Sequence, residues 1–197
     1  MLRTWLALLA VLMGVVASYP AYGAAVSHDD PRWQQAREDL ARGRTSEAKA
    51  EFEKLLTQYP DNADLHLFLG MTLLRLRDPR GAEAEARKAV ALDPQHVDAR
   101  TFLAWIELEV RGDVNAALSE YQKVIEIHPE LPEAYSNLGW AYNNLARFPE
   151  ALDPLKKAIE LNPMLPEAHF NLGLLYMKMP QKDEALLKKQ RADALSS

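Results

Sequence analysis

The chain has 197 residues, of which 48% are apolar and 26% are charged, a balance that suits a folded protein with a core. Its 28 acidic residues exceed its 23 Lys and Arg residues, which argues against nucleic acid as the main partner, because phosphate contacts need clustered basic side chains. The sequence has no cysteine, which excludes a disulfide framework and a lipid-modified N-terminal cysteine.

The first 23 residues are predicted to be an export signal. Arg3 precedes an apolar run over residues 5–17, which is shorter than the roughly 20 residues needed to span a bilayer. Small residues suitable for signal peptidase end the segment, so cleavage is predicted after Gly23, followed by a linker over residues 24–28. The expected location is the bacterial periplasm or the medium. The alternative is an uncleaved membrane anchor that leaves the rest of the chain facing the periplasm.

A first helical hairpin is predicted over residues 29–62. Asp29 or Asp30 would cap its first helix, Pro31 would stand in the first turn, and Gly43 would end the helix. The apolar stripe of this helix is narrow, as expected for an end repeat with no preceding neighbour.

The second and third hairpins are predicted over residues 63–96 and 97–131. The turn of the second is expected from Asp78 to Gly81. The third is one residue longer than its neighbours, and the extra residue is expected near the turn from Arg111 to Asp113, where a longer loop costs little.

The fourth hairpin, over residues 132–165, has the most complete pattern. Apolar residues recur at helical spacing on both sides of a central break. Gly139 is expected to leave space for the first helix to approach Ala151 and Ala158 of the second helix closely. Prolines recur about every 34 residues, and each is expected to end the second helix of a hairpin.

This stretch resembles the tetratricopeptide repeat, whose signature is Tyr, Leu-Gly, Tyr, Ala, a large apolar residue, Ala and Pro at fixed spacing. The resemblance implies an all-α fold, a right-handed α-solenoid of about five helical hairpins. The fifth hairpin, over residues 166–197, starts in the same way. Its second helix carries Lys189 and Asp193 at positions that are apolar elsewhere, so it is expected to be the C-terminal cap.

Motifs for catalysis or metal binding are missing from the sequence. The five histidines are scattered without metal-ligand spacing, and no nucleophile or phosphate-loop motif occurs, so we expect no enzyme activity, no metal and no cofactor. His66 and His169 share the repeat position of Tyr135 and are interpreted as packing residues. Acidic pairs such as Glu107 and Glu109 are expected at helix starts or on exposed faces.

The resemblance also implies that the first helices of successive hairpins line a concave, peptide-binding groove. Carried over residue by residue, the expected lining is Trp33, Leu67, Met71, Leu74, Trp105, Leu108, Trp140, Asn143, Asn144, Phe170, Leu174 and Met177. Trp105 and Trp140 share one repeat position, so they are expected side by side as anchors. The alternative is that the tryptophans pack between hairpins. The clamp of this family for acidic C-terminal peptides has asparagine where this chain has tryptophan, which disfavours a cochaperone role.

The leading functional hypothesis is a non-enzymatic scaffold that binds a peptide or helix of a partner protein in this groove and assists assembly of an envelope complex. Two alternatives stay open: a self-associating structural protein, and an accessory subunit of an exported enzyme.

Overall fold

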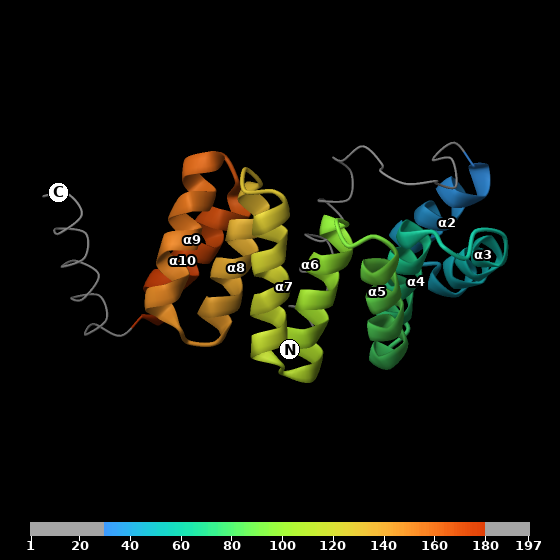
Figure 1. The fold of residues 1–197 in the computed structure, drawn as a ribbon, viewed down its shortest axis with the longest axis horizontal. Coiled ribbons are helices and arrows are strands. Elements are labelled where there is room, and N and C mark those ends of the chain that lie inside the picture. Colours follow the sequence, from blue (N-terminus) through green and yellow to red (C-terminus); the bar gives the residue numbers. More distant parts are fainter. Residues whose placement is uncertain (1–29, 180–197) are drawn as a thin grey trace, which may run out of the picture. The chain divides into compact units, whose positions relative to one another are not determined.

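The computed structural model describes residues 30–179, which form helices joined by short turns (Figure 1). The predictions for the leader, for the linker and for the second helix of the fifth hairpin lie outside the described residues. Within residues 30–179 the expectation of an all-α helical repeat fold is confirmed. The helices are α2 (Pro31–Ala41), α3 (Thr45–Gln58), α4 (Ala63–Arg75), α5 (Pro79–Leu92), α6 (Val97–Ile106), α7 (Val114–Ile127), α8 (Pro132–Asn144), α9 (Phe148–Leu161) and α10 (Pro166–Lys178).

The chain divides between Val110 and Arg111 into two compact units. In the first unit, α2 packs with α3, α3 with α4, and α4 with both α5 and α6. In the second unit, α8 packs against α7, α9 and α10, and α9 also packs against α10. Each unit is therefore a stack in which helices adjacent in sequence bury their apolar faces against each other.

The predicted start and end of the first helix are confirmed. The Asp30 carboxylate accepts a hydrogen bond from the Arg32 backbone N–H at 2.9 Å, and Pro31 opens α2. Gly43 follows the helix with φ of +79°, a left-handed conformation that costs glycine little.

The turn of the second hairpin lies earlier than predicted. Arg77 has φ of +64°, and Asp78 is already the N-cap of α5, accepting from the Gly81 N–H at 2.9 Å. Pro79 is therefore the first helical residue of α5 and not part of the turn. The Asp-Pro sequence indicated a helix start because a proline lacks the N–H that would go unpaired there.

The extra residue of the third hairpin is accommodated in a helix rather than in the turn. Directly after α6, residues Glu107–Arg111 form one π-helical stretch, η1. A π-helix closes its hydrogen bonds over one more residue than an α-helix does, so it absorbs a single insertion without breaking the helix.

The core of the first unit contains an aromatic cluster. The Trp33 ring lies edge-on to Phe52 and Phe68, with centroid distances of 5.8 and 5.0 Å, and the Arg37 guanidinium stacks on Phe68. Edge-to-face pairs of this kind stabilise the fold beyond the free energy gained by burying the apolar area of the rings.

Gly139 lies at the contact between α8 and α9, as predicted. A methyl group at Gly139 would stand 2.5 Å from Leu155 Cγ and 3.2 Å from the Ala151 carbonyl oxygen. The close neighbours are thus Leu155 and Ala151, whereas the sequence indicated Ala151 and Ala158. The missing Cβ allows the α9 backbone to approach α8 closely.

The fourth residue of α4, α6, α8 and α10 ties each helix to the loop before it. In all four cases the side chain hydrogen-bonds the backbone carbonyl of the proline six residues earlier. The pairs are His66 Nε2 with Pro60 (2.8 Å), Arg100 Nε with Pro94 (2.7 Å), Tyr135 Oη with Pro129 (2.9 Å) and His169 Nε2 with Pro163 (2.8 Å). Because a carbonyl only accepts, each side chain is the donor. Three chemically different residue types therefore form the same structural hydrogen bond.

Candidate functional site

In the second unit, Asn171 joins α8 to α10. Its Nδ2 donates to Ser136 Oγ at 3.2 Å, and its backbone oxygen accepts from Asn143 Nδ2 at 3.3 Å. Ser136, Asn143 and Asn171 are all buried. Since Ser136 and Asn143 are two turns apart on α8, the bonds hold α10 along α8 at two points. The sixth residue of α10 is therefore held against the fifth and twelfth residues of α8.

Three predicted groove residues form a line on α10. Phe170 and Met177 are 66% and 83% exposed, and Leu174 between them is half-buried. The spacing of four and three residues places all three on one helical face. We call Phe170, Leu174 and Met177 the α10 strip.

The predicted groove residues on α8 differ in their exposure to solvent. Trp140 is half-buried and Asn144 is exposed. Asn143 is buried and acts as a structural amide, donating to α10 while its Oδ1 atom accepts no hydrogen bond. Accessible contact atoms on α8 thus come from Trp140 and Asn144.

The predicted groove residues of the first unit are buried. Trp33 is 2% exposed and belongs to the aromatic cluster with Phe52 and Phe68. The others are exposed by 8% or less, and they are Leu67, Met71, Leu74, Trp105 and Leu108. Trp105 and Trp140 belong to different units, so their placement side by side stays a prediction.

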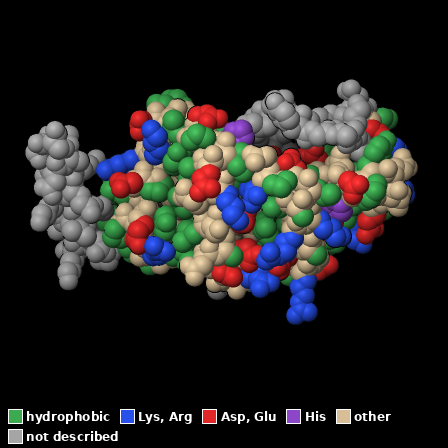
Figure 2. Space-filling view, viewed as in Figure 1, with side chains coloured by type: hydrophobic (Ala, Val, Ile, Leu, Met, Phe, Trp, Pro, Cys, Tyr) green, Lys and Arg blue, Asp and Glu red, His purple; other side chains and the backbone are tan. Residues whose placement is uncertain are grey.

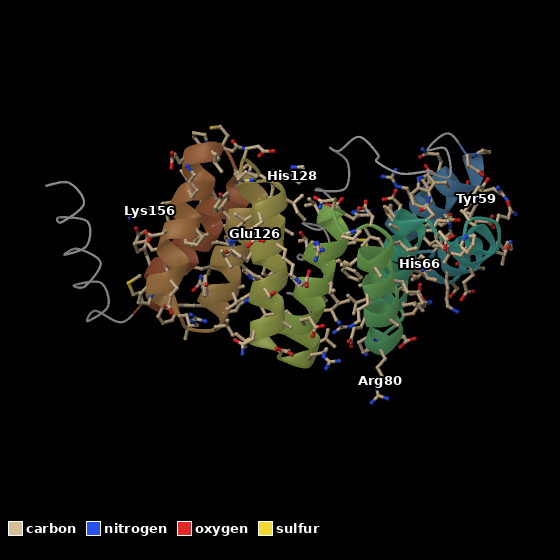
Figure 3. The ribbon with its side chains drawn as sticks, in the orientation of Figure 1. Tyr59, His66, Arg80, Glu126, His128 and Lys156 are labelled. Carbon is tan, nitrogen blue, oxygen red and sulfur yellow. The ribbon has the colours of Figure 1, made fainter. Side chains whose placement is uncertain are left out.

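His66 and His96, the histidines in the described part of the first unit, both contact carboxylates. His66, labelled in Figure 3, belongs to α4. Its Nδ1 lies 2.5 Å from Oε2 of Glu85, which connects α4 to α5. His96, the N-cap of α6, donates from Nε2 to Asp64 at 3.0 Å. Burial of the His96 ring disfavours its charged form, but Asp64 and the nearby Asp98 outweigh this and raise the pKa of His96 above its ordinary value.

One of the acidic pairs departs from the prediction of exposed faces. Glu107 is 2% exposed and forms an ion pair with Arg87 of α5, which also binds Glu83. Glu109, the other member of the pair, is exposed as predicted, and partial desolvation raises its pKa. Glu107 was expected to be solvated because it is charged, but it follows Leu103 by four residues and Ala104 by three, which places it on the packed face that continues from α6.

Among residues 30–179, no group of three or more His, Asp or Glu side chains could hold a metal ion. Over the same range, none of the helices has the length and apolar character required to span a bilayer. On the face seen in Figure 2, acidic and basic side chains are interspersed over the described surface.

Family models match both units. A model described as tetratricopeptide repeat matches residues 39–106, and one described as TPR repeat matches residues 111–145 and 141–179. The chain is a tetratricopeptide repeat protein.

This tetratricopeptide repeat protein is similar to parts of two larger Pseudomonas proteins. It is 32% identical to a probable biofilm formation methyltransferase, WspC, of Pseudomonas putida over 52% of the chain and 24% of that protein. It is 30% identical to the type IV pilus assembly protein PilF of Pseudomonas aeruginosa over 51% of the chain and 40% of that protein. The alignments thus span less than half the length of either relative. The structure of YrrB, described as a TPR protein with an unusual peptide-binding site, aligns at 29% identity and a TM-score of 0.60 over 71% of both chains.

Sequence reasoning missed two structural features of this tetratricopeptide repeat protein. Asn171 was not singled out, although an asparagine between two apolar residues on a packed helix indicates a buried hydrogen bond. The bond from the fourth helical residue to the proline carbonyl was also missed. His66, Arg100 and Tyr135 have different side chains, so no single residue type marks that position.

Proposed function

We propose that this chain is a non-enzymatic scaffold that holds a peptide or helix of a partner protein on the concave face of its second unit. Tetratricopeptide repeats are protein–protein interaction scaffolds. The observation that carries the proposal is the exposure of the α10 strip, in which Phe170 and Met177 are 66% and 83% exposed. Large apolar side chains aligned on a helix face and left in water are typical of a surface that binds another protein.

Within the predicted groove, we assign partner contact to the accessible residues and packing to the buried ones. Trp140, half-buried on α8, stands beside the α10 strip because Asn171 holds the two helices together. Aromatic and methionine side chains are adaptable contacts for an apolar partner. Asn144, exposed at the end of α8, offers a polar contact at the margin of this surface.

The similarity to YrrB supports a peptide as the ligand, because the solved structure of that protein is described as having a peptide-binding site. The similarity to PilF supports a role in the cell envelope, since PilF is a type IV pilus assembly protein. Together with the predicted export signal, these similarities favour a chain that assists assembly of an envelope complex.

A site-specific crosslinking experiment tests this proposal. A photoactivatable residue replaces Lys178, which is exposed at the end of the α10 strip, and in a control chain it replaces Glu160, exposed on α9. We expect irradiation of living cells to crosslink an envelope protein to position 178 and not to position 160. The crosslink should disappear when Phe170→Ser and Met177→Ser are combined.

Three other outcomes have distinct meanings. A crosslink that survives Phe170→Ser/Met177→Ser, or forms equally at position 160, would exclude the α10 strip as the binding surface. A crosslink only to a second copy of the chain would favour the self-associating alternative. A crosslink to an exported enzyme would favour the accessory-subunit alternative.

A further inference from the structure

The surface around the α10 strip contains two carboxylates that form no ion pair with any described residue. Glu133 and Glu167 occupy the second position of α8 and α10, and both are partly exposed. Within residues 30–179 neither forms a hydrogen bond or an ion pair. Glu150 and Glu160 of α9, in contrast, pair with Arg147 and Lys157 at 3.0 and 3.1 Å.

The two carboxylates lie at the same end of the same surface. Glu133 is one turn before Ser136 and Glu167 is one turn before Asn171, and Ser136 and Asn171 are hydrogen-bonded to each other. The axes of packed helices are roughly 8–10 Å apart, so the starts of α8 and α10, which carry the two carboxylates, are neighbours. Glu167 and Phe170 are three residues apart, which places this acidic end directly beside the start of the α10 strip.

The opposite end of the surface is basic. Lys178 ends α10, is exposed, and has no ion pair within the described residues. Eleven residues separate it from Glu167, or roughly 16 Å at 1.5 Å per residue. Along α10 the surface is thus acidic at the start of the helix, apolar in the middle and basic at its end.

A partner segment that covers the α10 strip must be compatible with the charges at its two ends. An apolar segment laid over Phe170 would remove water from Glu133 and Glu167, which costs free energy unless a cation replaces the water. An acidic segment would add repulsion between like charges. Only a segment with Lys or Arg at that end both covers the apolar surface and compensates the carboxylates.

We propose that the partner segment is basic and apolar, with a Lys or Arg side chain between Glu133 and Glu167 and apolar side chains on Phe170, Leu174 and Met177. This inference rests on the proposed function and specifies the chemistry of the partner. The acidic residues also offset the positive ends of the dipoles of α8 and α10, a contribution to stability that exists without any partner. The test therefore has to separate binding from stability.

The test is selection of random 12-residue peptides by phage display on the purified full chain and on two variants. Glu133→Gln/Glu167→Gln removes the two carboxylates. Asp153→Asn removes an exposed carboxylate of α9 that lies off this face and pairs with no residue among 30–179, and it controls for the net charge of the chain.

We expect the full chain and Asp153→Asn to enrich peptides in which Lys or Arg adjoins aromatic or aliphatic residues. The Glu133→Gln/Glu167→Gln variant should lose the basic preference and keep the apolar one. A peptide selected on the full chain should bind this variant at least about fivefold more weakly at low salt, since two partly exposed ion pairs are lost. Circular dichroism should show that all three proteins remain folded.

Enrichment of neutral or acidic peptides by the full chain would overturn the inference and leave the proposed function standing. The same conclusion would follow if Glu133→Gln/Glu167→Gln kept the basic preference. If no selected peptide lost affinity for Phe170→Ser/Met177→Ser, the α10 strip would not be a binding surface, and the proposed function would fail together with the inference.

Discussion

At the scale of single residues, the hydrogen bond to a proline carbonyl explains why histidine, arginine and tyrosine alternate at one repeat position. Each reaches the same acceptor from the fourth residue of a first helix. The position selects a donor of sufficient length rather than a particular side chain. The histidines there are structural, in agreement with their interpretation as packing residues.

Tyr135→Phe should therefore destabilise the chain by about 1 kcal/mol, because the Pro129 carbonyl loses its donor while the ring still packs. Tyr142→Phe is the matched control, since the Tyr142 ring stacks with Arg147 and its hydroxyl forms no hydrogen bond within the described part of the chain. Urea unfolding of both variants measures the difference. Equal stability of the two would show that the bond to Pro129 contributes nothing.

His96 predicts a pH dependence with a defined sign. Its folded-state pKa is raised above the ordinary value of 6.5, so its stabilising contribution is present below pH 6.5 and is lost as pH rises through the folded pKa. Burial also raises the pKa of Asp98, which lowers stability as pH rises above its ordinary value of 3.8, so that transition starts at a lower pH than the one of His96.

Urea unfolding should thus show lower stability at about pH 8 than at about pH 6. His96→Asn keeps a residue that caps a helix well and removes the titrating ring, so it should reduce this difference. A difference unchanged in His96→Asn would assign the pH dependence to other groups.

At the scale of helices, two glycines at the same repeat position have opposite surroundings. Gly139 is closed in by Leu155 and Ala151, whereas no described atom lies within 4 Å of a methyl group built at Gly173. The sequence shows Leu-Gly in both places and does not separate them.

Gly139→Ala should destabilise the chain by about 1–3 kcal/mol through overpacking of α8 against α9. Gly173→Ala should stabilise it by about 0.5–1 kcal/mol, since alanine is the better helix former. Thermal unfolding compares the two. Destabilisation by Gly173→Ala would contradict this expectation and show that a methyl group at position 173 does not lie in open space.

At the scale of the whole molecule, the predicted groove separates into buried and exposed residues. Trp33→Ala should cost about 3–5 kcal/mol, because it empties the aromatic cluster of the first unit. Phe170→Ser/Met177→Ser should change stability by less than about 0.5 kcal/mol per site and abolish partner capture. Denaturation and the crosslinking assay on the same proteins measure both effects. A large loss of stability in the α10 variant would show that Phe170 and Met177 support the fold.

The repeat period, the start of the first helix at Pro31 and its end before Gly43, and the close approach at Gly139 could be predicted from the sequence, because each depends on local chemistry. A proline stops a helix, a glycine removes a Cβ, and apolar residues at helical spacing must find a partner surface. Family membership followed from the same local signs, since the period and the signature of the tetratricopeptide repeat are visible without coordinates.

Only the tertiary structure decided which members of the predicted groove are accessible. Trp33 and Phe170 both stand at positions that the family pattern assigns to the groove, yet Trp33 is 2% and Phe170 66% exposed. Periodicity specifies the face of a helix on which a side chain lies, but exposure depends on what packs against that face. Phe52 and Phe68 enclose Trp33 from α3 and α4, and that contact between distant residues cannot be read from spacing within one helix.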